Sequence, residues 1–389
     1  MRRFVSLIVS LMFAASSAMA QASEDFWSET RRGTNSFNRV ESEAHLAQAR
    51  AFGADFVRMA IGKWEGSRRD YLAGDLDDYK GLEDRDVAHL RSVLDGAERA
   101  GVPIVLTPLD LPGARWRQNN ANVADDRIWT DRAWWDAAAR YWTDIAREFG
   151  GHPAIVGYNL LNEPVPELDQ GIDETSATIE ERNAWCEQVR GTPRDLDAFY
   201  RHIIAAIRTV DPDTPIILDG GWYAQPMGIR CLTAIDDPHV LYAMHMYEPY
   251  GYTTWRWNQG RLTYPGQLFY GGQEESWDAA RIAAHLQPML DWSDSEGLSR
   301  DRILLGEFGC DRRVPGCAAY LGDVISSAEA AGIHWAFYAF REDVWDAMDY
   351  ELGDGPTPNG FYSEGGNGDV PRAANPMSET LRRALSPSP

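Results

Sequence analysis

The chain has 389 residues, enough for one large barrel or two ordinary domains. It is 44% hydrophobic, with 15 Trp, 16 Tyr and 13 Phe, so it can bury a sizeable core. Its formal net charge of -22 argues against nucleic acid or an anionic membrane as a partner, because phosphates would be repelled, whereas an uncharged ligand is compatible with it.

The first twenty residues have the pattern of a bacterial secretory signal peptide. Arg2-Arg3 precedes a short apolar run at 4–15, and Ala18-Met19-Ala20 is a small-x-small cleavage site, with Ala20-Gln21-Ala22 as a second possibility. The run is too short for a stable membrane anchor, and no later apolar stretch is long enough to span a bilayer. We therefore expect cleavage of residues 1–20 and export to a periplasm or the extracellular space.

Short apolar runs alternate with longer amphipathic segments along the rest of the chain. The expected strands are residues 34–37, 55–61, 102–107, 154–162, 215–218, 239–245, 302–306 and 333–340. The expected helices are residues 43–52, 84–100, 131–149, 196–210, 278–296, 318–331 and 377–385. Two stretches without a clear period, 165–193 and the aromatic-rich 247–276, are predicted to be long loops.

Strands that alternate with helices in one uninterrupted run imply βαβ units and a parallel sheet. Eight such units favour a (β/α)8 barrel, a TIM barrel with enlarged βα loops, that forms a single domain over residues 21–389. A doubly wound open sheet is the competing architecture, but it would normally carry a glycine-rich fingerprint after an early strand, and the chain has none.

The four cysteines are Cys186, Cys231, Cys310 and Cys317, and an even number in an exported protein suggests disulfides. Of the three possible pairings we favour Cys310–Cys317, which would close a short loop, and Cys186–Cys231 by elimination. Buried free thiols are the alternative. The spacings do not match a zinc site, and no set of His and Cys has metal-ligand spacing, so neither a metal nor a cofactor is expected.

Polar residues follow several predicted strands, and in a parallel barrel the carboxyl ends of the strands share one mouth, where active sites lie. Glu163 follows the fourth strand and Glu307 follows the seventh. Paired carboxylates across a cleft are what glycoside hydrolysis needs. The other polar residues expected at this mouth are Arg58, Asp110, Asn162, Asp219, His245, Tyr247 and Tyr338.

Four motifs at predicted strand ends carry a resemblance to a known family. They are Arg58 in Phe-Val-Arg-Met, Asn162-Glu163-Pro164, His245-Met-Tyr247 and Gly306-Glu307-Phe-Gly309. In this order, over essentially the whole mature chain, they resemble glycoside hydrolase family 5, the cellulase family. The resemblance implies a (β/α)8 catalytic domain and a retaining mechanism.

In the resemblance, Glu163 corresponds to the acid/base and Glu307 to the nucleophile. Independently, a glutamate beside a second, ionised glutamate has a raised pKa, which suits a proton donor near neutral pH. An arginine and a tyrosine hydroxyl near Glu307 would lower the pKa of that carboxyl. Retaining hydrolysis also requires the two carboxyl groups to lie about 5–5.5 Å apart.

Four further positions match residues that support the two glutamates. Asn162 resembles the residue that hydrogen-bonds the sugar 2-hydroxyl, and Arg58 resembles the arginine that holds the nucleophile ionised. His245 and Tyr247 resemble the pair that lines the subsite where the bond breaks. Arg58 could instead be a structural partner of a buried carboxylate, and His245 could be a core histidine with satisfied hydrogen bonds.

The chain departs from the family at two strand ends. Where the family often has a histidine near the end of strand three, this chain has Leu109 or Asp110. The family usually ends strand eight with a tryptophan platform for the sugar, and here we expect Tyr338 in that place, with Trp335 as the alternative. Trp222, directly after the fifth strand, is a further candidate for stacking on sugar.

Aromatic residues of the 247–276 stretch could stack on pyranose rings or cover the barrel rim; they are Tyr250, Tyr252, Trp255, Trp257, Tyr264, Phe269 and Tyr270. Asp219 lies in Asp-Gly-Gly, a common turn, and is predicted to be structural. Glu248 and Asp110 are rival carboxylates at the mouth.

The sequence therefore predicts an exported retaining β-glycosidase that hydrolyses a β-linked oligo- or polysaccharide through two glutamates, most simply an endo-β-1,4-glucanase. A mannanase, an exo-acting β-glucosidase or glucanase, or a transglycosylase of the same fold is the alternative. A non-catalytic glycan-binding barrel is the alternative from another class. No nucleic acid or membrane partner is expected.

Overall fold

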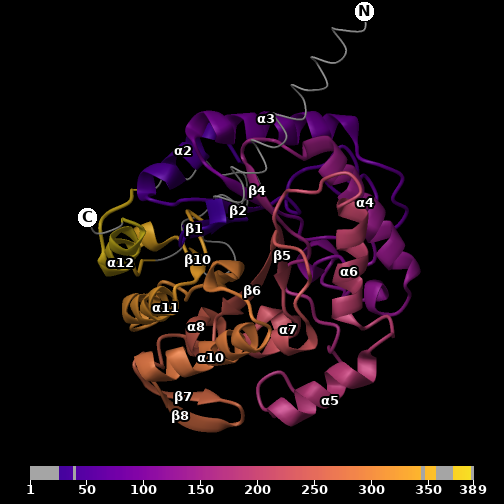
Figure 1. Ribbon diagram of the computed structural model, residues 1–389. Helices are drawn as coiled ribbons and strands as arrows, with labels where there is room; N and C mark the ends of the chain where they lie inside the picture. Colours follow the sequence, from indigo (N-terminus) through magenta and orange to yellow (C-terminus); the bar gives the residue numbers. More distant parts are fainter. Residues whose placement is uncertain (1–25, 38–40, 343–346, 356–370, 387–389) are drawn as a thin grey trace, which may run out of the picture.

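The computed structural model describes residues 26–37, 41–342, 347–355 and 371–386, so the predicted signal peptide lies outside the described residues. Eight parallel strands close a barrel in the order β1-β10-β9-β6-β5-β4-β3-β2, which confirms the predicted (β/α)8 fold (Figure 1). They are β1 (Arg32–Ser36), β2 (Val57–Ala60), β3 (Ile104–Thr107), β4 (Ile155–Asn159), β5 (Ile216–Asp219), β6 (Val240–Met246), β9 (Ile303–Phe308) and β10 (His334–Phe337).

Helices surround the central strands (Figure 1). The main ones are α2 (Glu43–Phe52), α3 (Asp84–Ala100), α4 (Ala133–Phe149), α6 (Leu196–Ile207), α10 (Ala279–Ser295), α11 (Cys317–Ala331) and α12 (Pro376–Leu385). The bounds of α2 are those predicted, because local signals set them: the Ser42 hydroxyl accepts the His45 N–H, and Gly53 ends the helix at a φ of 118°. Within the described ranges, no helix has the length and apolar character needed to cross a membrane.

Both predicted long loops contain secondary structure, so these two predictions were wrong. The 165–193 stretch holds α5 (Ile179–Val189), which begins with a capping box at Thr178. The 247–276 stretch holds two single-turn helices, α8 (Tyr250–Thr253) and α9 (Trp255–Asn258), and an antiparallel hairpin of β7 (Gly266–Tyr270) and β8 (Gln273–Trp277). Gly271 and Gly272 form the hairpin turn with φ of 58° and 81°, and a Gly-Gly pair between two short strands is a hairpin signal.

The two predicted disulfides, Cys186–Cys231 and Cys310–Cys317, are both present. The first joins α5 to the segment before β6, and its sulfurs belong to a small apolar cluster with Trp185. The predicted free-thiol alternative is therefore wrong.

Replacement of both Cys186 and Cys231 by alanine is expected to lower the free energy of unfolding by about 4 kcal/mol, because cross-linking a longer loop removes more entropy from the unfolded chain. The matched pair Cys310→Ala and Cys317→Ala should cost only about 2.5 kcal/mol, since the sequence separation is 7 residues rather than 45. Denaturant unfolding of the two double variants measures the difference. An equal or reversed order would contradict the loop-length argument.

Candidate active site

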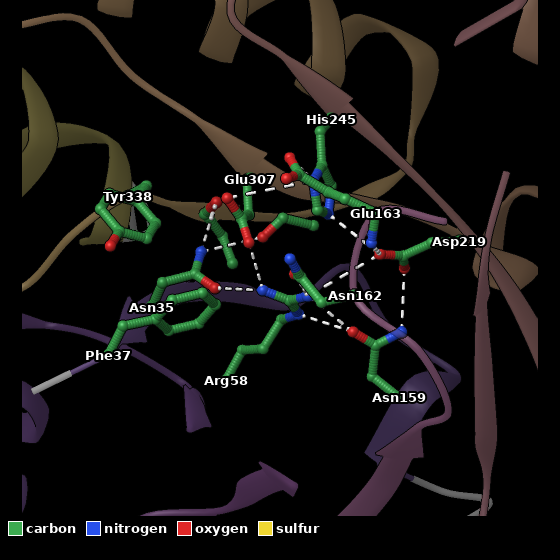
Figure 2. Close-up of polar contacts among 12 residues, drawn as sticks. Asn35, Phe37, Arg58, Asn159, Asn162, Glu163, Asp219, His245, Glu307 and Tyr338 are labelled. Atoms are coloured by element: carbon green, nitrogen blue, oxygen red, sulfur yellow. Dashed lines mark hydrogen bonds and ion pairs between the residues drawn. The ribbon is translucent and has the colours of Figure 1, made fainter. Parts of the chain in front are cut away.

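Arg58 on β2 is the centre of a buried polar network at the mouth of the barrel, and its side chain is only 1% exposed. Nη1 donates to Glu307 Oε1 at 2.5 Å and to Asn35 Oδ1 at 2.9 Å. Nε and Nη2 donate to Asn159 Oδ1 at 2.9 and 2.6 Å, and Nη2 also donates to Asn162 Oδ1 at 2.6 Å (Figure 2). Arg58 on β2 is thus held against Glu307 on β9 by side chains that come from β1 and β4.

Glu307, near the end of β9, accepts hydrogen bonds at both carboxylate oxygens. Arg58 donates to Oε1, and the Tyr247 hydroxyl donates to Oε2 at 2.8 Å. Burial raises the pKa of Glu307 above its usual value, while His245, Arg58 and the Tyr247 hydroxyl act in the opposite direction. The two predicted donors are present and lower the pKa, but the desolvation of this buried carboxylate, which the sequence did not reveal, outweighs them.

Glu163 lies in the loop after β4, which ends earlier than predicted, at Asn159. Its φ of 48° is in the left-handed region, which is strained for a residue with a side chain. Strained backbone of this kind is often found at functional sites. The Glu163 N–H donates to Asp219 Oδ2 at 3.0 Å, which holds this backbone in place. Burial raises the pKa of Glu163 to about 8, and the charges of Asp219 and Glu248 add to the effect. The raised pKa was predicted, but its causes are burial and these two carboxylates.

The two glutamates are close together. One carboxylate oxygen of Glu163 and one of Glu307 lie within 4.8 Å of each other, and His245 contributes a ring nitrogen to the same group. This close approach of the two oxygens is compatible with the short separation, about 5–5.5 Å, of retaining glycosidases.

His245 on β6 is paired with the catalytic candidates, because the strand register places it beside Glu307. Its Nδ1 lies 2.8 Å from Glu163 Oε1 and 3.9 Å from Glu307 Oε2. Burial lowers the pKa of His245, while the nearby carboxylates of Glu307 and Asp219 act in the opposite direction. A side chain at Gly306 would bring a Cβ 3.1 Å from Nε2, so a glycine at this position gives the ring its space.

Asp219 at the end of β5 is fully buried; it was expected at the mouth and predicted to be structural. It accepts the Glu163 N–H and the Asn159 Nδ2 at 2.9 Å, and it lies 3.8 Å from Arg58. Its side chain therefore positions the Glu163 loop and also helps to raise the Glu163 pKa.

A cavity of about 750 Å³ opens above the two glutamates, and Asn162, His245, Tyr247 and Tyr338 contribute to its wall. Tyr338 lies there as predicted, with its hydroxyl donating to Glu342 at 2.9 Å. Phe37, which sequence reasoning missed, packs edge-on against Tyr338 with ring centroids 5.2 Å apart.

Two predicted sugar platforms, Trp335 and Trp222, do not line this cavity. Trp335 is 0% exposed, and its indole N–H donates to Glu329 at 2.7 Å on the outer side of the barrel. Trp222 is 1% exposed and packs against Trp185 in the disulfide cluster. Both are core residues, so the prediction that they contact substrate was wrong.

Tyr223 lines the cavity in place of its neighbour Trp222. Trp222, Tyr223 and Ala224 all have left-handed backbone angles, with φ of 49°, 56° and 59°. This turn, within α7 (Gly221–Ala224), buries the indole and turns the tyrosine toward Glu163 and Glu174, whose charges act on its hydroxyl. Three consecutive non-glycine residues in this conformation give no sequence signal.

The aromatic 247–276 stretch contributes Tyr250 to the cavity wall. Tyr252 and Tyr264 are buried in the core, whereas Trp257 and Phe269 are exposed on the rim. Of the rival carboxylates, Glu248 is on the cavity wall but accepts the Tyr247 N–H, at 3.1 Å. Asp110 lies outside this cavity, in a neighbouring one.

Tyr247→Phe is expected to shift the acidic limb of kcat/KM upward by about one to two pH units. The reason is that the Tyr247 hydroxyl donates a hydrogen bond to the charged carboxylate of Glu307. Loss of this donor raises the Glu307 pKa, so a higher pH is needed to ionise Glu307 in the free enzyme. Tyr252→Phe is the matched control, since its hydroxyl donates to the Pro315 carbonyl instead. A pH profile measures both, and an unchanged limb in Tyr247→Phe would contradict the contact's role.

Comparison with known proteins agrees with this geometry. The family model described as Cellulase (glycosyl hydrolase family 5) matches residues 19–343. The chain belongs to glycosyl hydrolase family 5.

Individual relatives are distant. A β-xylosidase of Phanerodontia chrysosporium is 25% identical over 224 residues, which are 57% of this chain and 38% of that protein. Endoglucanase C of Acetivibrio thermocellus is 22% identical over 242 residues, which are 61% of this chain and 60% of that protein. The chain thus spans less than two thirds of the length of either relative.

Solved structures share the fold across most of the chain. A mutant form of Thermotoga maritima Cel5A in complex with cellobiose superposes with a TM-score of 0.63 at 16% identity, covering 93% of this chain and 98% of that one. Pseudomonas stutzeri endoglucanase Cel5A gives 0.60 at 18% identity, with 92% and 94% covered. At these identities the likeness supports the barrel within the family, and substrate preference depends on this chain's own residues.

Proposed function

We propose that this member of family 5 is a retaining β-glycosidase, most simply an endo-β-1,4-glucanase, in which Glu307 is the nucleophile and Glu163 the acid/base. One observation carries the proposal: Glu307 accepts hydrogen bonds from Arg58 and Tyr247, while Glu163, within 4.8 Å, has its pKa raised to about 8. Arg58 and Tyr247 favour the anionic form of Glu307 against the effect of its burial, and Glu163 keeps its proton at neutral pH.

In the first step, a Glu307 oxygen forms a bond to the anomeric carbon as the glycosidic bond breaks, and Glu163 transfers its proton to the departing oxygen. The product is a glycosyl ester of Glu307. Esterification removes the charge of Glu307, so the pKa of Glu163 falls. Glu163, now a carboxylate, takes a proton from water as the water oxygen attacks the anomeric carbon and releases Glu307.

Asn162 is proposed to bind the sugar beside the reacting carbon. Its Oδ1 accepts from Arg58, and among the described residues its Nδ2 has no hydrogen-bond partner. The amide orientation is therefore fixed with a free donor at the cavity wall. Tyr223, Tyr250 and Tyr338 supply aromatic surface on the same wall, which suits the C–H faces of pyranose rings.

The glucan preference is supported by the relatives and structural neighbours, which include endoglucanases and a cellobiose complex. The β-xylosidase relative supports the exo-acting alternative. Export of a single domain over residues 21–389 is supported by the predicted signal peptide and the two disulfides, which persist in oxidising compartments.

A panel of soluble β-glucans, β-mannans and aryl glycosides tests the proposal. We expect a rapid fall in β-glucan viscosity with few new reducing ends, and first products with the β configuration by proton NMR. Release of single sugars without a viscosity fall would replace the endo-glucanase with an exo-acting enzyme. First products in the α configuration would exclude retention, and binding without hydrolysis would favour the non-catalytic barrel.

A further inference from the structure

A second cavity of about 460 Å³ lies beside the catalytic one, between the loops that follow β2 and β3. Lys63 and Gln118 line both cavities, so the two adjoin at these residues. The volume is within the ~300–1,000 Å³ of small-molecule sites and far exceeds the ~30 Å³ share of one water. A ring-sized group entering from the catalytic cleft therefore has room here.

The wall of this side cavity carries a hydroxyl that has no partner among the described residues. Tyr141 on α4 is only 2% exposed, and Leu76 beside it is buried as well. The Tyr141 ring packs on Tyr79, with centroids 5.3 Å apart, yet among the described residues its hydroxyl has no hydrogen-bond partner. Tyr141 lines the cavity together with Asp110 and Asp70. Because no protein group bonds to this hydroxyl, it is available to a ligand in the cavity.

The rest of the wall combines aromatic and amide groups. Trp64 and Tyr71 meet edge to face, with centroids 5.2 Å apart, and form an aromatic corner. Asn119 is held in place opposite, because its Nδ2 donates to Asp110 Oδ2 at 2.7 Å and to the Gly62 carbonyl at 3.1 Å. The backbone passes very close to this pair: a Cβ at Gly62 would lie 3.0 Å from Asp110 Oδ2.

The basic side chains of the wall have carboxylate partners, so they offer no free charge to an ionic ligand. Lys63 is 3.0 Å from Glu342, and Arg69 is 2.6 Å from Asp77. Asp70 pairs with Arg115 at 2.8 Å.

Asp110 is the remaining acid of the wall. Burial raises its pKa to about 7, although the Trp116 N–H and the Asn119 amide donate to it. Near neutral pH much of it is protonated and can donate as well as accept. An uncharged, hydroxyl-rich ligand fits these groups better than an anion or a cation does.

We propose that this side cavity binds a single neutral sugar that branches from the β-glucan backbone in the catalytic cleft, so that the substrate is a branched β-glucan. This inference rests on the proposed function. An aromatic corner beside hydroxyl, amide and carboxyl groups suits a pyranose. A volume of about 460 Å³ has room for one sugar, so the cavity suits a branch of a single residue.

The test compares a linear cello-oligosaccharide with the same backbone carrying single α-linked xylosyl branches. We expect a higher kcat/KM on the branched probe. Tyr141→Phe should lower the branched-to-linear ratio of kcat/KM by about two- to tenfold, mainly through KM, because it removes one neutral hydrogen bond. Tyr79→Phe is the matched control, since its hydroxyl donates to Asp144 at 2.8 Å outside the cavity, and it should preserve the ratio.

The outcomes separate the two proposals. Hydrolysis of both probes with no branched preference, or with a ratio that Tyr141→Phe leaves unchanged, overturns the branch site and leaves the β-glucanase intact. An equal loss on both probes in Tyr141→Phe also overturns it, because the cavity would then bind the backbone itself. Hydrolysis of neither probe overturns the proposed function, and the branch site with it.

Discussion

Glu307→Gln is expected to lower kcat on a natural β-glucan by a factor on the order of 10⁴ or more, as removal of a covalent nucleophile does elsewhere. The amide has nearly the same shape as the carboxylate but cannot form the glycosyl ester. Arg58 can still donate to the amide oxygen, the Tyr247 hydroxyl can accept from the amide nitrogen, and Arg58 keeps Asp219 at 3.8 Å, so the barrel should remain folded. Initial rates by reducing-sugar assay, with circular dichroism and a melting curve, separate chemistry from unfolding.

Glu248→Gln is the matched control, because Glu248 is a buried carboxylate on the same cavity wall. Glu248 lies outside the hydrogen-bond network of Arg58. Loss of its charge should reduce kcat by less than about tenfold, because a neighbouring charge affects the rate less than a reacting group does. A folded Glu307→Gln enzyme that keeps a tenth of the wild-type rate would remove Glu307 from the mechanism. The reverse pattern, with Glu248→Gln inactive, would transfer the role to the rival carboxylate.

Glu163→Gln is expected to lower kcat on the same glycan by about 10²–10⁴-fold, the usual contribution of a general acid. The loss should depend on the leaving group. An aryl glycoside whose phenolate leaves without a proton needs no acid in the first step, so the glycosyl-enzyme should still form and accumulate. A burst of phenolate followed by slow turnover is the expected signature.

The pH profile supplies a second signature of Glu163. Its pKa is raised to about 8, so the proton it donates is present below that pH and is lost as the pH rises through it. The wild-type enzyme should therefore lose kcat/KM on the alkaline side near pH 8, and Glu163→Gln should lack this alkaline limb. Equal losses on aryl and natural substrates, with the alkaline limb retained, would show that another group donates the proton.

The residues at strand ends could be predicted from the sequence, because the periodicity marks where each strand ends and a barrel brings these ends to one mouth. Their meeting does not depend on the conformation of the loops. Arg58, Asn162, Glu163, His245, Tyr247, Glu307 and Tyr338 all meet there. The extent of burial could not be read in the same way. The Glu307 pKa is raised because desolvation exceeds the effect of its donors, and only the packed structure shows that balance.

Backbone conformation and distant pairing account for the other differences. Whether Trp222 or Tyr223 faces the cavity depends on consecutive left-handed residues that no propensity favours. Asn35 and Asn159 come from β1 and β4, far apart in sequence, and only the closed barrel brings both to Arg58. The β7–β8 hairpin is different, since its Gly271-Gly272 turn was a readable signal within a stretch predicted to be a loop.

The most direct measurement of the central claim is trapping of the covalent intermediate. A 2-deoxy-2-fluoro β-glycoside with a good leaving group slows both steps, because fluorine destabilises the positive charge that develops at the sugar ring, while the leaving group keeps the first step fast enough for the ester to accumulate. We predict a stoichiometric mass increase of one fluoroglycosyl unit, with peptide mapping that places it on Glu307. An adduct on Glu163 or Glu248, or substrate turnover through an enzyme that never carries an adduct, would contradict the account.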